Sequence, residues 1–337
     1  MMILPDFNLI RPTSLSEALT VLAQNPGAMP VAGGTDLLVS MKHGLFKPPI
    51  LVDLKGAQEL HRIEAGEDGA ILGACVRLSQ VKNHPQIRAR YPALSQAAEA
   101  VASPPLQNRG TLGGNICLDT RCYFYNQSEF WRHSLGGCLK KEGPICRVAP
   151  GAKRCFANFS SDTVPALIAL GARVRLVGGP EGEREFPLEQ FFVEDGIRRN
   201  VLLPGELVAE LCLPAPRNLL SGYRKYRQRE SIDYPLVSVA VALRIVEGRL
   251  RDVRVALGAM ASAPVLALET MEALEGSIPT PELLANAAGL VVKRAKPVKN
   301  QAGSPGHRRL MARVMCRRLL EELTGAGRTF QSGGRHE

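Results

Sequence analysis

Residues 29–38 read MPVAGGTDLL, and residues 108–115 show a related pattern, NRGTLGGN. The first stretch predicts a short strand that runs into Gly33-Gly34 and then into the start of a helix. Paired glycines let the backbone approach a ligand closely and leave amide N–H groups free to point at an anion. A single motif of this kind is also common as a plain strand–helix turn. Two of them favour a dinucleotide whose pyrophosphate is held from both sides, although neither has the Rossmann GxGxxG spacing.

A cysteine-bearing insertion follows the second glycine loop. It carries Cys122, Cys138, Cys146 and Cys155, separated by fifteen, seven and eight residues. Structural zinc sites usually use CxxC pairs, and this stretch contains none. Cubane iron–sulfur clusters accept looser spacing, because each iron needs only one protein thiolate. Four unrelated thiols are the remaining alternative, but such a loop would be prone to oxidation. The spacing therefore favours a 4Fe–4S cluster over zinc.

Aromatic residues accompany these cysteines, and the other four cysteines of the chain lie elsewhere. We expect the aromatic residues to keep water off the cluster or to form a small satellite core: Tyr123, Phe124, Tyr125, Phe130 and Trp131. Cys75, Cys212 and Cys316 lie in apolar or helical surroundings and are predicted to be buried small residues. Cys117 is predicted to be an inward-packing strand residue, with a role as an alternative ligand left open.

The length of 337 residues allows two or three domains and a substantial core. No apolar run approaches the length that crosses a bilayer, and the start of the chain lacks a basic region followed by an apolar core. We therefore expect a cytoplasmic protein with no membrane contact. Eight cysteines in a cytoplasmic protein argue against a disulfide framework.

The formal net charge of +10 raises the question of nucleic-acid binding. Basic residues cluster at Arg224–Arg229 and Lys293–Lys299, but neither cluster interleaves aromatic residues as a base-stacking surface would. A basic surface that meets acidic partner proteins, or one that holds a phosphate-rich ligand, explains the charge equally well. We expect no nucleic-acid partner.

The order of predicted elements divides the chain. Residues 57–110 alternate strands and helices, and residues 215–222 resemble a boundary. Beyond it we expect an apolar antiparallel pair, Leu236–Ile245 and Leu250–Leu257, joined at Glu247-Gly248, and then helices. The expected division has three parts: residues 1–216, residues 217–325 and a polar tail at 326–337. The first part consists of subdomains 1–55 and 56–216 and carries the insertion at 117–158.

The sequence resembles a known family at both glycine loops, at Asp162 and along Tyr226–Arg229 and Asp233–Leu236. These stretches are similar to the FAD-binding subunit of molybdenum hydroxylases, the xanthine dehydrogenase family. The resemblance covers nearly the whole chain and implies an α+β fold. A two-subdomain PCMH-type (vanillyl-alcohol-oxidase-like) FAD-binding domain would be followed by a C-terminal α+β domain of the carbon monoxide dehydrogenase flavoprotein type.

The insertion makes the resemblance more specific, because only some members of the family carry one. Arg121–Gln127 with the three later cysteines is similar to the β subunit of 4-hydroxybenzoyl-CoA reductases, in which the insertion carries a 4Fe–4S cluster. Some periplasmic aldehyde oxidoreductases have a comparable flavin subunit and are the closest competitor.

The resemblance also implies roles for individual residues. Asp162 would accept a hydrogen bond from the cofactor, Val101 and Val208 would line the flavin or adenine, and Lys225 would lie near the flavin. Arg224 is the neighbouring candidate for that last role, and plain ion pairing is the alternative for Lys225. The FAD pyrophosphate would be wrapped by Met29, Pro30, Val31, Ala32, Gly33, Gly34, Thr35, Asp36 and Leu37, and by Thr111, Gly113, Gly114 and Asn115.

The implied function is electron transfer. Electrons from a donor such as ferredoxin would pass through the 4Fe–4S cluster and FAD to a 2Fe–2S small subunit and a molybdopterin-containing large subunit, in a heterohexamer of two αβγ trimers. There 4-hydroxybenzoyl-CoA would be reduced to benzoyl-CoA, a step of anaerobic aromatic degradation. No catalytic residue is expected in this chain, because no nucleophile or acid–base pair accompanies the glycine loops. A zinc-stapled basic binding protein without a redox role is the alternative from another class.

Overall fold

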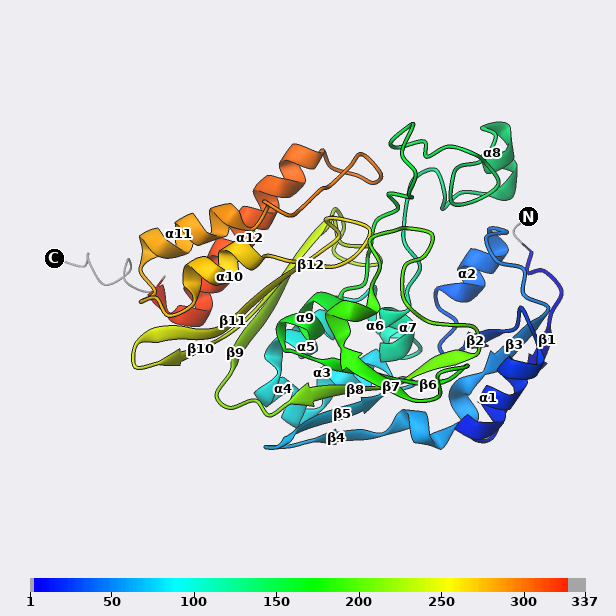
Figure 1. The fold of residues 1–337 in the computed structure, drawn as a ribbon, viewed down its shortest axis with the longest axis horizontal. Coiled ribbons are helices and arrows are strands. Elements are labelled where there is room, and N and C mark those ends of the chain that lie inside the picture. The colour runs from blue at the N-terminus through cyan, green and yellow to red at the C-terminus, as the bar shows by residue number, and fades with distance from the viewer. Residues whose placement is uncertain (1–2, 327–337) are drawn as a thin grey trace.

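The computed structural model describes residues 3–326, and three sheets lie beside one another along the molecule (Figure 1). The tail expected at 326–337 lies, apart from its first residue, outside the described residues. Within the described part of the chain, no helix combines the length and the apolar character needed to span a membrane.

The N-terminal unit is a small parallel sheet in the order β1-β3-β2. Ser14 caps the first helix by accepting a hydrogen bond from the Glu17 amide at 3.2 Å, as its sequence position predicts. The unit consists of β1 (Asn8–Ile10), α1 (Leu15–Gln24), β2 (Met29–Val31), α2 (Leu37–Lys42) and β3 (Ile50–Asp53), followed by the 3₁₀ helices η1 (Leu54–Gly56) and η2 (Gln58–His61).

The central unit is a five-stranded antiparallel sheet in the order β4-β5-β8-β6-β7. Its strands are β4 (Ile63–Ala65), β5 (Gly69–Gly73), β6 (Arg173–Gly178), β7 (Arg184–Pro187) and β8 (Glu206–Pro214). Its helices are α3 (Leu78–Asn83), α4 (Pro85–Arg90), α5 (Pro92–Glu99), α6 (Pro104–Gln107), α7 (Leu112–Ile116), α9 (Thr163–Ala169) and the 3₁₀ helix η3 (Leu188–Phe191). Most of these helices pack with the sheet into the largest apolar core.

The C-terminal unit is an antiparallel sheet in the order β12-β11-β10-β9 with helices on one face (Figure 1). The predicted strand pair is present, with Glu247 and Gly248 at positive φ in its turn. The elements are β9 (Leu220–Tyr226), β10 (Val237–Val246), β11 (Arg249–Gly258), β12 (Val265–Leu266), α10 (Leu268–Leu274), α11 (Pro281–Leu290) and α12 (Pro305–Thr324). The first of the expected helices, α10, begins at Leu268, after the short β12.

Strand β10 joins the C-terminal unit to the central unit, because alternate side chains along it point to opposite faces of the sheet. Val239 and Val241 pack on the C-terminal helices, whereas Ala240 and Ala242 belong to the central core. The small alanines let α9 pack directly on β10 and β11. The two units therefore share a buried, apolar interface.

The insertion is a mostly irregular lobe that projects beside α2 and contains one short helix, α8 (Glu129–Ser134) (Figure 1). Its two ends are held together by two backbone hydrogen bonds between Arg121 and Asn158, of 2.8 and 2.6 Å. The fully buried Arg132 donates to the carbonyl of His43 at 2.9 Å, which anchors α8 to the end of α2. The lobe is thus fixed against the N-terminal unit.

Candidate functional site

The two glycine loops meet back to back. A Cβ atom on Gly33 would lie 2.1 Å from the carbonyl oxygen of Arg109 and 3.0 Å from the Cα of Gly110. Only glycine permits this approach. Gly34 has a φ of +70°, a conformation that L side chains rarely adopt. The structure therefore forms one half-exposed backbone surface from two loops that are far apart in the sequence.

The second loop is partly helical, which differs from the loop expected there. Thr111 caps α7 and accepts a hydrogen bond from the Gly114 amide at 3.2 Å. Gly113 is packed so closely on Ala74 that a Cβ would lie 2.6 Å from the alanine Cβ. Gly114 is exposed, so the open side of this turn is its backbone. A close approach of a ligand to Gly114 is consistent with the cofactor site that the sequence predicts.

Asn115 links this turn to Asp162. Its side-chain oxygen accepts hydrogen bonds from the Ser161 and Thr163 hydroxyls, both at 2.7 Å. Asp162 itself is buried and accepts from the Tyr223 hydroxyl at 2.6 Å and from Lys225 at 2.8 Å. Burial raises the pKa of Asp162, and Lys225 and Tyr223 oppose that change. The Asp162 carboxylate thus has two protein donors, and its expected contact with the cofactor stays a prediction.

Lys225 and Arg224 point to opposite sides of β9, as neighbours on a strand must. Lys225 faces inward and also donates to the carbonyls of Ala100 and Asp233. Arg224 pairs instead with Glu322 at the surface. Of these two neighbours, Lys225 is therefore the one that lies beside Asp162.

The remaining predicted cofactor residues lie near these loops or in the core behind them. Met29, Pro30 and Val31 form β2, Ala32 and Thr35 flank the glycine pair, and Leu37 begins α2. Val101 is half-buried against the central core, and Val208 belongs to it with 5% exposure.

Asp36 connects the first glycine loop to the insertion. Its carboxylate forms an ion pair with Arg121, the residue before Cys122, and accepts a hydrogen bond from the Tyr234 hydroxyl at 3.4 Å. The Arg121 guanidinium also lies 4.6 Å from the centroid of the Tyr234 ring. This cluster joins the N-terminal unit, the insertion and the C-terminal unit. Asp36 was predicted as a cofactor residue, whereas no role in the site was predicted for Arg121.

The four insertion cysteines line a single recess that is partly open to solvent. All four are buried, and all eight cysteines of the chain, each within the described residues, are unpaired thiols. Phe124, Tyr125, Leu139 and Lys140 complete much of the wall. Four buried, unpaired thiols that line one recess are a donor set of the kind that holds an iron–sulfur cluster, in which each iron needs only one protein thiolate.

A backbone amide is directed at one of the sulfur atoms. The Ala157 amide donates to Cys155 Sγ at 3.3 Å, whereas the Tyr125 amide donates to the Cys122 carbonyl at 3.1 Å. A hydrogen bond to sulfur stabilises bound thiolate. Without metal, burial raises the pKa of Cys122 to about 11 and that of Cys155 to about 12, so both are protonated at neutral pH. Metal binding would therefore release protons.

Two expectations about the insertion were wrong. Cys117 does not lie in a strand; it caps the C-terminus of α7, because Gly113 and Gly114 continue into a helical turn. Phe130 and Tyr123 do not cover the recess, since their exposed fractions are 85% and 50%. Tyr125 and Phe124 do line the recess, and Trp131 packs on Phe124 with ring centroids 6.3 Å apart. Outside the insertion, Cys75 and Cys316 are buried as expected, whereas Cys212 is half-buried.

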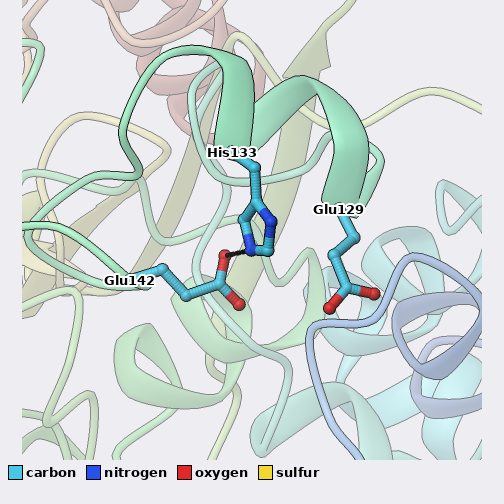
Figure 2. Close-up of side chains that lie close together, drawn as sticks. All are labelled: Glu129, His133 and Glu142. Atoms are coloured by element: carbon cyan, nitrogen blue, oxygen red, sulfur yellow. Dashed lines mark ion pairs between the residues drawn. The ribbon is translucent and has the colours of Figure 1, made fainter.

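A second group of possible ligands lies on the outside of the insertion. Figure 2 shows Glu129 and His133 from α8 beside Glu142, with donor atoms within 4.8 Å of one another. Each carboxylate already has a cationic partner: Lys47 lies 2.8 Å from Glu129, and Arg132 lies 3.5 Å from Glu142. His133 Nε2 lies 3.2 Å from Glu142. These ion pairs account for the arrangement without a metal.

Comparisons with known proteins agree with this geometry. Residues 5–216 match the FAD binding domain in molybdopterin dehydrogenase, and residues 222–323 match the CO dehydrogenase flavoprotein C-terminal domain. The aldehyde oxidoreductase FAD-binding subunit PaoB of Escherichia coli K12 is 36% identical over 268 residues, which cover 77% of this chain and 82% of that protein. The carbon monoxide dehydrogenase medium chain of Hydrogenophaga pseudoflava is 26% identical over 95% of this chain and 97% of its own length.

Solved structures match over nearly the whole chain. Carbon monoxide dehydrogenase from Hydrogenophaga pseudoflava has a TM-score of 0.79 at 27% identity, with 96% of this chain and 99% of that chain covered. Quinoline 2-oxidoreductase from Pseudomonas putida 86 has a TM-score of 0.78 at 26% identity and the same coverage. The fold and the paired glycine loops define an FAD-binding subunit of an oxidoreductase. More narrowly, the chain belongs to the FAD-binding medium subunits of the xanthine dehydrogenase and CO dehydrogenase family, and the expected fold class is confirmed.

Proposed function

We propose that this chain is an electron-transfer subunit that holds a 4Fe–4S cluster in addition to FAD. The observation that carries the proposal is the recess in which Cys122, Cys138, Cys146 and Cys155 converge as buried, unpaired thiols. When bound, the two cofactors would supply one- and two-electron chemistry between an external carrier and the partner subunits. This chain would supply the thiolates, the N–H donor to sulfur, and the Phe124 and Tyr125 side chains that restrict water.

For FAD we propose the residues that the sequence predicted, all of them except Lys225 within a domain of residues 1–216. The close contact of Gly33 with Arg109 supports a pyrophosphate site formed by both loops, because it brings the backbones of the two loops together. Asp162, Lys225, Val101 and Val208 would then lie around the rest of the cofactor. Asn115 would act mainly by positioning the Asp162 turn.

The proposed partners are a molybdopterin-containing large subunit and a 2Fe–2S small subunit. Relatives named as the medium chains of glyceraldehyde dehydrogenase and carbon monoxide dehydrogenase support an assembly of several different chains. A heterohexamer and a ferredoxin-type carrier remain part of this proposal.

Two reactions are candidates for the whole complex. The 36% identity to a subunit named for aldehyde oxidation favours an aldehyde oxidoreductase. The resemblance of the insertion to 4-hydroxybenzoyl-CoA reductases favours reductive dehydroxylation of a thioester. Because the identity to PaoB is measured over most of both chains, we place aldehyde oxidation first. Assays of the purified complex distinguish them: aldehyde oxidation with an artificial acceptor supports the first, and benzoyl-CoA formation with reduced viologen supports the second.

The cluster itself is tested on the full chain purified under argon. We expect flavin absorption with a broad shoulder across the violet and blue, together with iron and acid-labile sulfide in equal amounts. Zinc without sulfide would mean that the cysteines form a structural staple, and the proposal would be wrong. The FAD assignment is independent of this result, because it rests on the glycine loops.

A further inference from the structure

Lys140, in the wall of the cysteine recess, forms a buried ion pair with Asp119, which does not itself line the recess. Lys140 Nζ lies 2.7 Å from Asp119 Oδ1, and the two side chains are 6% and 5% exposed. The ammonium group also donates to the Thr120 hydroxyl at 2.7 Å and to the Thr120 carbonyl at 3.3 Å. Lys140 lines the same recess as Cys138, from which it is separated by one residue.

Other polar groups fix both members of the pair. The Tyr125 hydroxyl donates to Asp119 Oδ2 at 2.8 Å, and the ring centroid of Tyr125 lies 4.1 Å from Lys140 Nζ. The Thr120 amide donates to Asp119 Oδ1 at 2.9 Å, and Arg199 Nη1 lies 3.5 Å from the same oxygen. Tyr125 is itself a wall residue, so the pair and the recess share one packed network. The Lys140 charge is therefore held at a fixed position in the wall of the recess, with the Asp119 charge fixed next to it.

Such an arrangement has an electrostatic consequence for a redox centre. Reduction adds negative charge, so a fixed cation nearby favours the reduced form and a fixed anion favours the oxidised form. Burial strengthens both effects, because screening by water is weak. An exposed pair would contribute far less.

We propose that Lys140 and Asp119 set the reduction potential of the centre held by the four cysteines, with Lys140 raising it and Asp119 lowering it. This inference rests on the proposed 4Fe–4S cluster. It differs from a purely structural role, in which the pair would only attach residues 138–140 to residues 119–120. A structural role predicts loss of iron or of stability, but no opposite shifts in potential.

The test is a redox titration of the full chain, monitored by electron paramagnetic resonance. Lys140→Met should lower the midpoint potential and Asp119→Asn should raise it. Each change should alter the equilibrium constant for reduction at least tenfold, which is about 59 mV for a one-electron couple. The double variant should lie between the two single variants, and Lys140→Arg, which keeps the charge, should lie near wild type. Lys153→Met, an exposed lysine of the same insertion, is the matched control and should leave the potential unchanged.

Iron content is measured in each sample, so the two hypotheses fail in different ways. If wild-type protein holds no iron–sulfur cluster, the proposed function is wrong and this inference falls with it. If clusters are present and the two single variants shift in the same direction or stay at the wild-type potential, only this inference is overturned. Should Lys140→Met lose iron, Lys140→Gln, which can still hydrogen-bond Thr120, is titrated in its place and must give the same sign.

Discussion

Lys225 Nζ lies 2.8 Å from Asp162 Oδ2, with the two side chains only 4% and 5% exposed. Lys225 belongs to β9 of the C-terminal unit, and Asp162 precedes α9 of the central unit. The Tyr223 hydroxyl completes the contact at 2.6 Å, and burial together with the Asp162 carboxylate raises the pKa of Tyr223 well above its ordinary value. Tyr223 therefore stays a neutral donor. This buried polar contact joins the two units beside the proposed flavin site.

Lys225→Met should destabilise the protein strongly. Removing one partner of a buried ion pair leaves an uncompensated charge, which costs about 3–5 kcal/mol. The measurement is the free energy of guanidinium unfolding, with retained FAD determined in parallel. Arg224→Met is the control, because its pair with Glu322 is 42% and 54% exposed and such pairs are worth about 0–1 kcal/mol. Equal effects of the two substitutions would contradict the assignment of Lys225 as the inward partner.

Gly33→Ala should abolish stoichiometric FAD binding. The added methyl group would lie 2.1 Å from the Arg109 carbonyl oxygen, so the two loops would have to separate. The measurement is the ratio of flavin to protein absorbance after purification. Gly289→Ala is the matched control, since no atom lies within 4 Å of the added methyl and the site is inside a helix. That substitution should keep FAD and stabilise α11 by roughly 0.5–1 kcal/mol. Full flavin content in Gly33→Ala would contradict a site built from both loops.

Arg121→Met should weaken FAD binding although Arg121 lies in neither glycine loop. It removes the cation that pairs with Asp36 and stacks on Tyr234, so the first loop loses a fixed contact. Loss of a hydrogen bond to a charged group costs roughly 1.5–3 kcal/mol, which corresponds to about a ten- to hundredfold faster release of flavin if the contact is absent in the released state. Release is followed by the rise in FAD fluorescence on dilution. Arg154→Met, which removes an exposed pair with Glu194, is the control and should leave the release rate unchanged.

Serine substitution at each of the four recess cysteines should lower iron content while Cys117→Ser and Cys212→Ser leave it at the wild-type level. The first four sulfur atoms share one recess, whereas Cys117 and Cys212 lie outside its lining. Iron per flavin, measured in protein purified under argon, distinguishes the two groups. An equal loss of iron in Cys117→Ser would mean that Cys117 is a ligand.

The sequence predicted regular elements best where local pattern and tertiary packing agree. The pair β10–β11 was expected within one or two residues, because alternating apolar residues flank a Glu247-Gly248 turn. The strand predicted at Cys117 was wrong because the pair Gly113-Gly114, taken without its tertiary contacts, is typical of a loop. Contact of Gly113 with Ala74 and capping by Thr111 favour a helical turn there instead.

The sequence predicted which residues form the candidate site, but not which of them are in contact. The sequence identified the four cysteines as a set, yet the order of aromatic residues could not say that Phe130 faces solvent while Tyr125 is buried. The contacts of Arg121 with Asp36 and of Lys140 with Asp119 join residues 85 and 21 positions apart in irregular chain. Neither has a local pattern, so only the folded arrangement shows them. A lysine two residues after Cys138 was the one available signal.

The most direct test of the account is an electron paramagnetic resonance spectrum of the dithionite-reduced full chain, recorded without any partner subunit. We predict the signal of a reduced 4Fe–4S cluster, integrating to about one spin per FAD, and its loss in Cys138→Ser with FAD retained. A spectrum with no iron–sulfur signal from protein that contains its full complement of FAD would contradict the account.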